Sequence, residues 1–195
     1  QTDTLMLGYF RPMSEVALYG AAYPLAYGLL LVLTAFGYVY FPMASRLDAD
    51  GSRGGLDAIY TVTTKWVYVL TFPAFLAFVV FPADVLTAVF GARYAPGAPA
   101  LAILAFGFFA NVTAGRNRQT LSALGHTNVL MLVTVGTAAL NVALNLLLVP
   151  GFGDVGAAVA SASAYLTLNV AVCGYLYARF AITPLSGSNV RIFVA

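Results

Sequence analysis

The sequence has little charge, one cysteine and one histidine, and each shortage excludes a class of protein. Only 8% of its 195 residues are charged, against about a quarter in a soluble domain. So few charges cannot cover a soluble surface, and 61% hydrophobic residues exclude a disordered chain. A formal net charge of +2 does not supply the dense basic patch of a nucleic-acid-binding module. Cys173 and His126, each the single residue of its type, exclude an internal disulfide and a metal cluster built on cysteine or histidine.

Long stretches of the chain carry no charge at all. No charged residue lies between Glu15 and Arg46, or between Arg118 and Asp154. Further uncharged runs cover residues 66–83, 94–115 and 155–178. A helix needs about 20 apolar residues to cross the hydrocarbon core, and lipid offers no partner to unpaired backbone groups. The runs therefore predict an all-α, polytopic membrane helix bundle with about five full transmembrane helices and one partial helix.

Helix boundaries follow from the prolines, glycines and polar turns between these runs. We expect one helix to end at residue 10 and the others to cover residues 15–45, 65–90, 99–124, 128–149 and 155–179. Pro24, Pro73 and Pro82 then fall inside helices, where they are expected to produce kinks. The polar segment 48–64 is expected to form a loop that carries a short helix on the membrane surface.

The basic residues predict the orientation of the bundle. Alternate loops lie on the same side of a membrane, and one side receives only Arg11 and Arg93. The loops and terminus of the opposite side contain Arg46, Arg53, Lys65, Arg179 and Arg191. Because basic residues accumulate in cytoplasmic loops, segment 48–64, the turn near residue 125 and the C-terminus are predicted to be cytoplasmic.

The first residues predict that the bundle is incomplete. Thr4 to Phe10 is mostly apolar and ends in a loop, as the last part of a transmembrane helix would. The sequence before it has neither a methionine nor the basic region of a targeting signal. We therefore expect residues 1–195 to form a single transmembrane bundle that is a fragment of a longer protein.

Two motifs match known signatures in their letters only. Gly151–Gly156 fits G-x-G-x-x-G, but a dinucleotide site needs a strand before it and an acidic residue about 20 positions after it. An uncharged run precedes this motif and no acid follows Asp154, so a tight turn between two membrane helices is expected. Asp48 and Asp50 form the D-x-D sequence that is typical of many glycosyltransferases, although a solvated loop is the favoured interpretation.

Polar or small residues follow one face of three expected helices. The three sets are Thr134, Thr137, Asn141 and Asn145; Asn111, Gly115, Arg118, Ser122 and Gly125; and Gly156, Ala160, Ser163 and Thr167. Such stripes either pack helices closely together or line a polar cavity. We favour packing for the third set, and a cavity for the face of Arg118 and for Asn141 and Asn145.

Three charges are expected within the membrane, where charge is costly and usually faces a cavity or a partner. They are Asp3, Arg116 and Arg118. At 100° per residue, Arg116 is rotated about 200° from Arg118 on a helix. Arg118 lies on the polar face and is therefore the better candidate for the cavity. The alternative for both arginines is that they extend to the lipid headgroups.

Several segments together resemble one family. They are residues 3–10 (DTLMLGYF), 15–22 (EVALYGAA), 90–94 (FGARY), 121–126 (LSALGH) and, most specifically, 140–158 (LNVALNLLLVPGFGDVGAA). In this order and spacing they resemble the second half of polysaccharide flippases, which belong to the multidrug/oligosaccharidyl-lipid/polysaccharide exporter superfamily. One departure is His126, at a position where a basic residue is commoner.

The resemblance implies two six-helix bundles around a central cavity, with this chain forming most of the C-terminal bundle. It implies a flippase without cofactor or enzymatic chemistry, which moves a lipid-linked oligosaccharide across the cytoplasmic membrane of a prokaryote by alternating access. Its partners would be the lipid-linked glycan, membrane lipid, the N-terminal half of the transporter and possible coupling cations. The competing hypotheses are a multidrug exporter of the same superfamily, a membrane-embedded glycosyltransferase that uses the D-x-D sequence, and a structural membrane subunit.

Roles for individual residues follow from combining this implied function with the polar faces. Arg118 and Arg116 would attract the pyrophosphate of the substrate, since arginine binds phosphate oxygens in pairs. Asn111, Asn141 and Asn145 would bond to sugars or stabilise the bundle. Asp3 would either pair with an arginine or couple transport to a cation.

Overall fold

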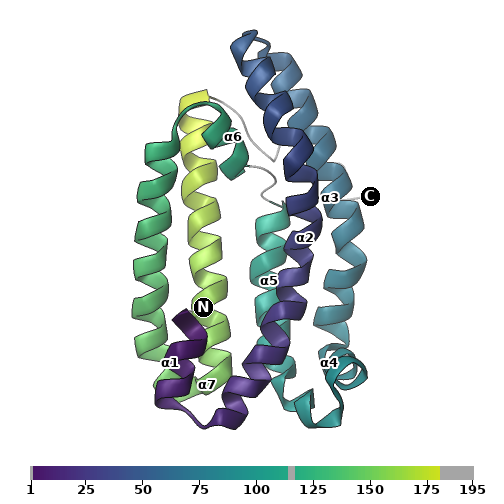
Figure 1. Ribbon diagram of the computed structural model, residues 1–195, viewed down its shortest axis with the longest axis vertical. Coiled ribbons are helices and arrows are strands. Elements are labelled where there is room, and N and C mark those ends of the chain that lie inside the picture. The colour runs from purple at the N-terminus through teal and green to yellow at the C-terminus, as the bar shows by residue number, and fades with distance from the viewer. Residues whose placement is uncertain (1, 114–116, 181–195) are drawn as a thin grey trace.

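The regular structure consists of helices throughout the residues described. The computed structural model describes residues 2–113 and 117–180. In chain order the helices are α1 (Thr2–Phe10), α2 (Met13–Ala49), α3 (Arg53–Val80), α4 (Pro82–Phe90), the 3-10 helix η1 (Ala92–Gly97), α5 (Ala98–Thr113), α6 (Asn117–Ala123) and α7 (Thr127–Phe180). Figure 1 shows a bundle of long helices that run side by side. Within the described ranges no strand occurs, and the all-α prediction is confirmed.

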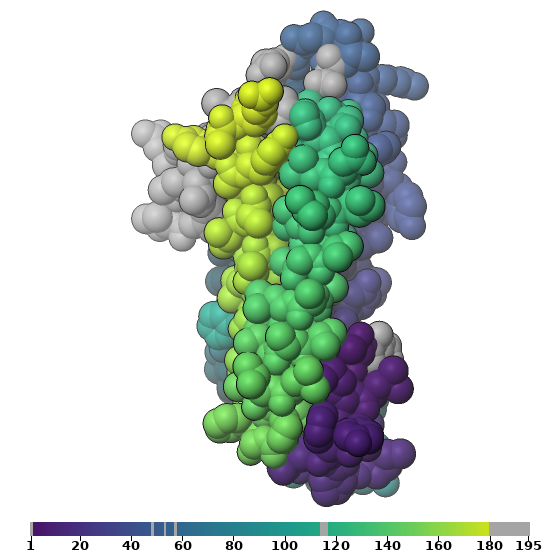
Figure 2. All heavy atoms as spheres, turned by 90° about the vertical axis from the view of Figure 1, so that its left-hand side faces the viewer, coloured from purple at the N-terminus to yellow at the C-terminus, as the bar shows by residue number. Residues whose placement is uncertain are grey.

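The longest helix, α7, is a pair of helices folded back on each other. Gly153 interrupts it with φ 58° and ψ −133°, a conformation that residues with a Cβ atom rarely adopt. We call residues 127–152 the first arm of α7 and residues 154–180 its second arm. Figure 2 shows the two arms in contact side by side, with α1 near their lower end. The predicted turn in the glycine-rich segment is thus confirmed.

The helices are long enough to cross a membrane repeatedly. Four stretches are sufficiently long and apolar: Met13–Leu47, Gly54–Val80, Ala92–Thr113 and Thr127–Arg179. The last of them contains both arms of α7, which makes five full crossings, and α1 adds a partial helix. In Figure 1 the α1–α2 turn and the α7 kink lie at one end of the bundle, and the α2–α3 and α6–α7 turns lie at the other. The predicted polytopic membrane bundle is therefore confirmed.

The helical hairpin of α2 and α3 is longer than its polar sequence predicted. α3 begins at Arg53 instead of near residue 65, so no separate surface helix forms in segment 48–64. The reason is a small apolar cluster at the tip of the hairpin, where Tyr40 and Ala44 of α2 pack against Leu56 and Tyr60 of α3. Burial of these side chains stabilises helix in a stretch whose composition alone favoured a loop.

Two predicted helices are divided in the structure. The expected helix 65–90 is broken at Phe81, and Pro82 starts α4 instead of kinking a continuous helix. Proline suits this first position because the N–H that it lacks would have no partner there. The expected helix 99–124 appears as α5 and α6, and the residues between them, which include Gly115 and Arg116, lie outside the described residues.

The centre of the bundle is α5, which α2, α3 and the second arm of α7 surround. Its buried residues include Leu101, Leu104 and Phe108. Gly107 brings α5 very close to the second arm, because a Cβ atom there would lie only 2.6 Å from Ala162 Cα. This contact fixes the distance between α5 and the arm that carries one wall of the cavity described next.

Candidate functional site

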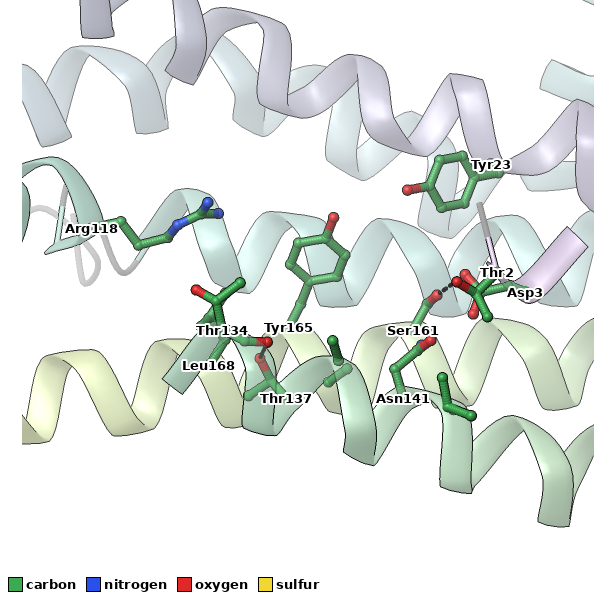
Figure 3. A pocket seen from close by; sticks show the side chains of 13 residues that line it. Thr2, Asp3, Tyr23, Arg118, Thr134, Thr137, Asn141, Ser161, Tyr165 and Leu168 are labelled. Carbon is green, nitrogen blue, oxygen red and sulfur yellow. Dashed lines mark hydrogen bonds between the residues drawn. The ribbon is translucent and has the colours of Figure 1, made fainter. Parts of the chain in front are cut away.

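A cavity of about 340 Å³ opens between α1, α2, α6 and the two arms of α7. Its polar lining residues include Asp3, Tyr23, Arg118, Thr137, Asn141 and Tyr165. Figure 3 shows that Arg118 and Asp3 lie toward opposite ends of the cavity, with Tyr165 between them. A site that has a cation at one end, an acid at the other and neutral hydroxyl and amide groups between them can bind a polar, anionic molecule.

The acidic end is a buried hydrogen-bond cluster around Asp3. Its carboxylate is 8% exposed and accepts hydrogen bonds from Asn145 Nδ2 at 2.6 Å, Ser161 Oγ at 2.7 Å and the Tyr19 hydroxyl at 3.3 Å. These donors come from α2 and from both arms of α7, so the carboxylate ties α1 to three other parts of the chain. A buried charge is costly unless it is hydrogen-bonded, which explains why four polar side chains gather here.

Asn145 has a second, unusual property. Its side-chain nitrogen bonds to Asp3 and also to the backbone oxygen of Asn141 at 2.9 Å. Its side-chain oxygen is buried and accepts no hydrogen bond from the described residues. Most buried polar atoms have a partner. A proton donor or a small cation bound at this position would interact with both the unpartnered oxygen and the buried carboxylate of Asp3.

The basic end depends on the short helix α6. Asn117 begins this helix and accepts a 2.7 Å hydrogen bond from the backbone N–H of Arg118. The Asn117 amide also donates to Asn169 Oδ1 at 3.3 Å and to Cys173 Sγ at 3.2 Å, both on the second arm of α7. On another side, the hydroxyl groups of Thr120 and Tyr40 are 2.6 Å apart and connect α6 to α2. These contacts fix the position from which the Arg118 side chain extends.

Among the side chains that the structure describes, the Arg118 guanidinium has no carboxylate partner. The ion pair found among these side chains joins Arg11 to Glu15 at the opposite end of the bundle. Arg118 is half-buried and lines the cavity, as Figure 3 shows. Within the described part of the chain, no carboxylate therefore competes with an anionic ligand for its donors.

The structure brings together some of the residues that the sequence selected. Asp3, Arg118 and Asn141 line the same cavity, and Asn145 lies directly behind Asp3. Asn111 is buried on α5 and is not among the residues that line the cavity. The predicted helical face is also divided, because Ser122 lines a separate, smaller cavity beside Arg118. Arg116 lies outside the described residues.

Sequence reasoning missed Ser161 and the tyrosines. Ser161 belongs to the second arm, where the predicted packing stripe contained Ser163 and Thr167 instead. Thr167 is exposed, whereas Ser161 is 3% exposed and bonds to Asp3. A visible signal was the spacing of the tyrosines on α2, since Tyr19, Tyr23 and Tyr27 recur every four residues and share one face of the helix. Of these, Tyr19 reaches Asp3 and Tyr23 lines the cavity.

Comparisons with known proteins bear on the same helices. A family profile described as "Polysaccharide biosynthesis protein" matches residues 1–99. An uncharacterized membrane protein of Methanocaldococcus jannaschii is 30% identical over 169 residues, which are 85% of this chain and 33% of that protein. A probable low-salt glycan biosynthesis flippase of Haloferax volcanii is 28% identical over 177 residues, 89% of this chain and 37% of that protein. This chain thus spans about a third of the length of these curated relatives. No solved structure matches it significantly.

Proposed function

Since the chain belongs to the family of polysaccharide biosynthesis proteins, we propose that it forms one helix bundle of a membrane flippase. The substrate would be a lipid-linked oligosaccharide or polysaccharide precursor, moved across the cytoplasmic membrane of a prokaryote by alternating access. The mechanism involves no covalent step: the cavity binds the polar headgroup, the bundles rock, and the headgroup leaves on the other side. The protein would therefore be a transporter and not an enzyme.

The observation that carries this proposal is the position of Arg118. Its guanidinium lies at the cavity wall without a carboxylate partner among the described residues, inside a bundle that otherwise has very few charges. Charge within a membrane is costly and is usually functional. Arginine presents a planar fork that binds two phosphate oxygens at once, and lipid-linked glycans carry a phosphate or pyrophosphate at the lipid junction. Asn141 and Thr137 would bond to the adjoining sugar.

Asp3 would couple the movement to a cation. Among the described residues it has no arginine partner, and its hydrogen bonds come from the neutral groups of Tyr19, Asn145 and Ser161. Its carboxylate could bind a proton, or it could ligate a small monovalent cation together with the unpartnered oxygen of Asn145. Because these groups belong to α1, α2 and α7, occupation of the site would change how these helices pack.

The remaining partners follow from the architecture that we propose. A second bundle, the N-terminal half of the same transporter, would close the open side of the cavity. The α2–α3 turn, the α6–α7 turn and the C-terminus would face the cytoplasm, as the basic residues predict. Arg118 would then meet the headgroup on its entry from the cytoplasmic leaflet, because α6 lies at that end of the bundle (Figure 1).

Two alternatives can be compared with the structure. A multidrug exporter of the same superfamily is favoured by the acid and the aromatic rings in the cavity, Asp3, Tyr23 and Tyr165, which suit an organic cation. The glycosyltransferase alternative receives no such support. Asp50 is exposed at the turn between α2 and α3 and does not line the cavity.

The test is transbilayer movement of a fluorescent lipid-linked oligosaccharide in proteoliposomes that contain the full-length protein. We expect Arg118→Ala to abolish this movement and Arg118→Lys to retain part of it, because an ammonium cannot copy the bidentate contact. Arg46→Ala is the matched control, since Arg46 is exposed near the end of α2. Efflux of a cationic dye, unaffected by Arg118→Ala, would support the multidrug exporter instead. Normal glycan movement by a well-folded Arg118→Ala variant would refute the proposed role of the arginine.

A further inference from the structure

Two tyrosines face the cavity from opposite walls. Tyr23 comes from α2 and Tyr165 from the second arm of α7, and both are half-buried. Figure 3 shows the Tyr165 ring between the Arg118 end and the Asp3 end, and Tyr23 across the cavity with its hydroxyl toward the Arg118 end. Neither ring is needed to explain the binding of a phosphate by Arg118.

The same buried ring holds both tyrosines in place. Phe108 of α5 is 1% exposed and packs edge-on against Tyr23 and Tyr165, with ring centroids 5.5 and 4.8 Å away. The close approach of Gly107 to Ala162 fixes α5 against the arm that carries Tyr165. Tyr27 stacks on Tyr23 with centroids 6.0 Å apart, and it also meets Phe108 edge-on at 5.9 Å. The two cavity rings are therefore oriented before any ligand arrives, and little conformational entropy is lost when they bind one.

We infer that Tyr23 and Tyr165 form a sugar-binding subsite for the hexose that is linked directly to the phosphate held by Arg118. This inference rests on the proposed function and adds the part of the headgroup that the tyrosines recognise. A pyranose ring has apolar C–H faces and a polar rim, and a tyrosine ring offers a flat apolar face and a hydroxyl at its edge. Each hydroxyl group can donate one hydrogen bond and accept others, so the two tyrosines offer the sugar both donors and acceptors.

The position of the subsite determines which sugar it receives. Arg118 and Tyr165 line the same cavity, and Figure 3 shows them next to each other along its length. A phosphate on the guanidinium would place the next group of the headgroup against the Tyr165 ring. Ligand sites usually have volumes of about 300–1,000 Å³. At about 340 Å³, this cavity is a small one. It suits a phosphate with the adjoining sugar, while the rest of the glycan extends outside.

The experiment is a competition between two lipids for the full-length protein. One is a polyprenyl phosphate, the other is the same polyprenyl phosphate bearing a single hexose, and native mass spectrometry measures the ratio of bound species. The parent protein should prefer the hexosyl lipid. We expect Tyr165→Leu and Tyr23→Leu to reduce this preference by about three- to tenfold, while binding of the bare polyprenyl phosphate is retained. Retained binding shows that the variants are folded.

Two controls separate the subsite from its surroundings. Tyr38→Leu removes an exposed tyrosine of α2 that does not line the cavity, and it should leave the preference unchanged. Arg118→Ala should weaken both lipids together and keep their ratio. Equal binding of the two lipids by the parent protein, or tyrosine variants that retain the preference or weaken both lipids alike, would overturn the subsite. If the parent protein binds neither lipid, the proposed function itself fails, and the subsite with it.

Discussion

Gly153 lies directly against the carboxylate of Glu15. A Cβ atom at Gly153 would collide with Glu15 Oε2, and the same oxygen accepts a 2.9 Å hydrogen bond from Arg11 Nε. That hydrogen bond raises the pKa of Arg11 above its ordinary value, so its guanidinium stays charged. The kink of α7 therefore touches an ion pair at the start of α2, and this contact joins the last helical hairpin to the first turn of the bundle.

We expect Gly153→Ala to destabilise the bundle. The substitution forces a residue with a Cβ atom into φ 58° and ψ −133°, which costs on the order of 1–3 kcal/mol. It also pushes the Glu15 carboxylate away from the turn. The thermal unfolding of the purified protein in detergent measures the effect.

Gly151→Ala is the matched control for this prediction. Gly151 belongs to the same turn, but a Cβ atom there meets nothing within 4 Å and its backbone needs no positive φ. The double variant Gly153→Ala/Glu15→Ala should recover only part of the loss, since it relieves the collision but not the backbone strain. Equal stability of the two glycine variants would show that the kink does not depend on Gly153.

The cluster at Asp3 gives a prediction that separates stability from coupling. In Asp3→Asn the amide oxygen can accept the hydrogen bond from Asn145, and the amide nitrogen can donate to the hydroxyl groups of Ser161 and Tyr19. The unfolding temperature should therefore stay close to that of the parent protein. Asn145→Ala removes a donor from a buried carboxylate and should cost about 1–3 kcal/mol. Asn128→Ala, at an exposed position on the same arm of α7, is the control for that loss.

For transport, in contrast to stability, we expect Asp3→Asn to have the larger effect. Asp3→Asn removes the negative charge that we propose to bind the coupling cation, so glycan movement should lose its dependence on the sodium and proton gradients. The measurement is movement in proteoliposomes under each gradient, imposed separately. A variant that keeps the cation dependence of the parent protein would assign the coupling to another group.

The sequence predicted the bundle well because lipid restricts the choices. Backbone groups in hydrocarbon must bond within their own segment, so each long uncharged run had to be a helix. The predicted helix boundaries were wrong where they depend on contacts between helices. The start of α3 at Arg53 depends on the packing of Tyr60 against Tyr40, which composition does not reveal.

The sequence also predicted the residues of the candidate site better than it predicted their contacts. Asp3 and Asn145 stood out because a charge or an amide in an apolar helix is costly, but their 2.6 Å hydrogen bond joins residues 142 positions apart. Ser161 and Ser163 look alike in sequence, and the rotation of the second arm after Gly153 decides which of them is buried. Periodicity identifies a polar face, whereas the partner of that face depends on how separate helices rotate and pack.

The contact between Gly107 and Ala162 gives a prediction about packing. In Gly107→Ala the added methyl group would lie 2.6 Å from Ala162 Cα, so α5 and the second arm must separate. Overpacking of this kind typically costs about 1–3 kcal/mol. Gly136→Ala is the control, because a Cβ atom there meets nothing within 4 Å. Adding Ala162→Gly removes the Cβ atom at 2.7 Å but leaves the Cα atom at 2.6 Å, so it should restore only part of the loss in thermal stability. A double variant as unstable as the single one would place the strain elsewhere.

The orientation can be tested at two exposed residues at opposite ends of the bundle, Ser52 in the α2–α3 turn and Ala92 in η1. Cysteines would be introduced singly in a protein that carries Cys173→Ala, which removes the native thiol. Basic residues accumulate on the cytoplasmic side, and the α2–α3 hairpin contributes Arg46 and Lys65. A membrane-impermeant maleimide should therefore label Ala92→Cys in intact cells, and Ser52→Cys only after the membrane is permeabilised. The reverse pattern would invert the bundle, and Arg118 would then lie near the outer leaflet, where it could not receive a headgroup from the cytoplasm.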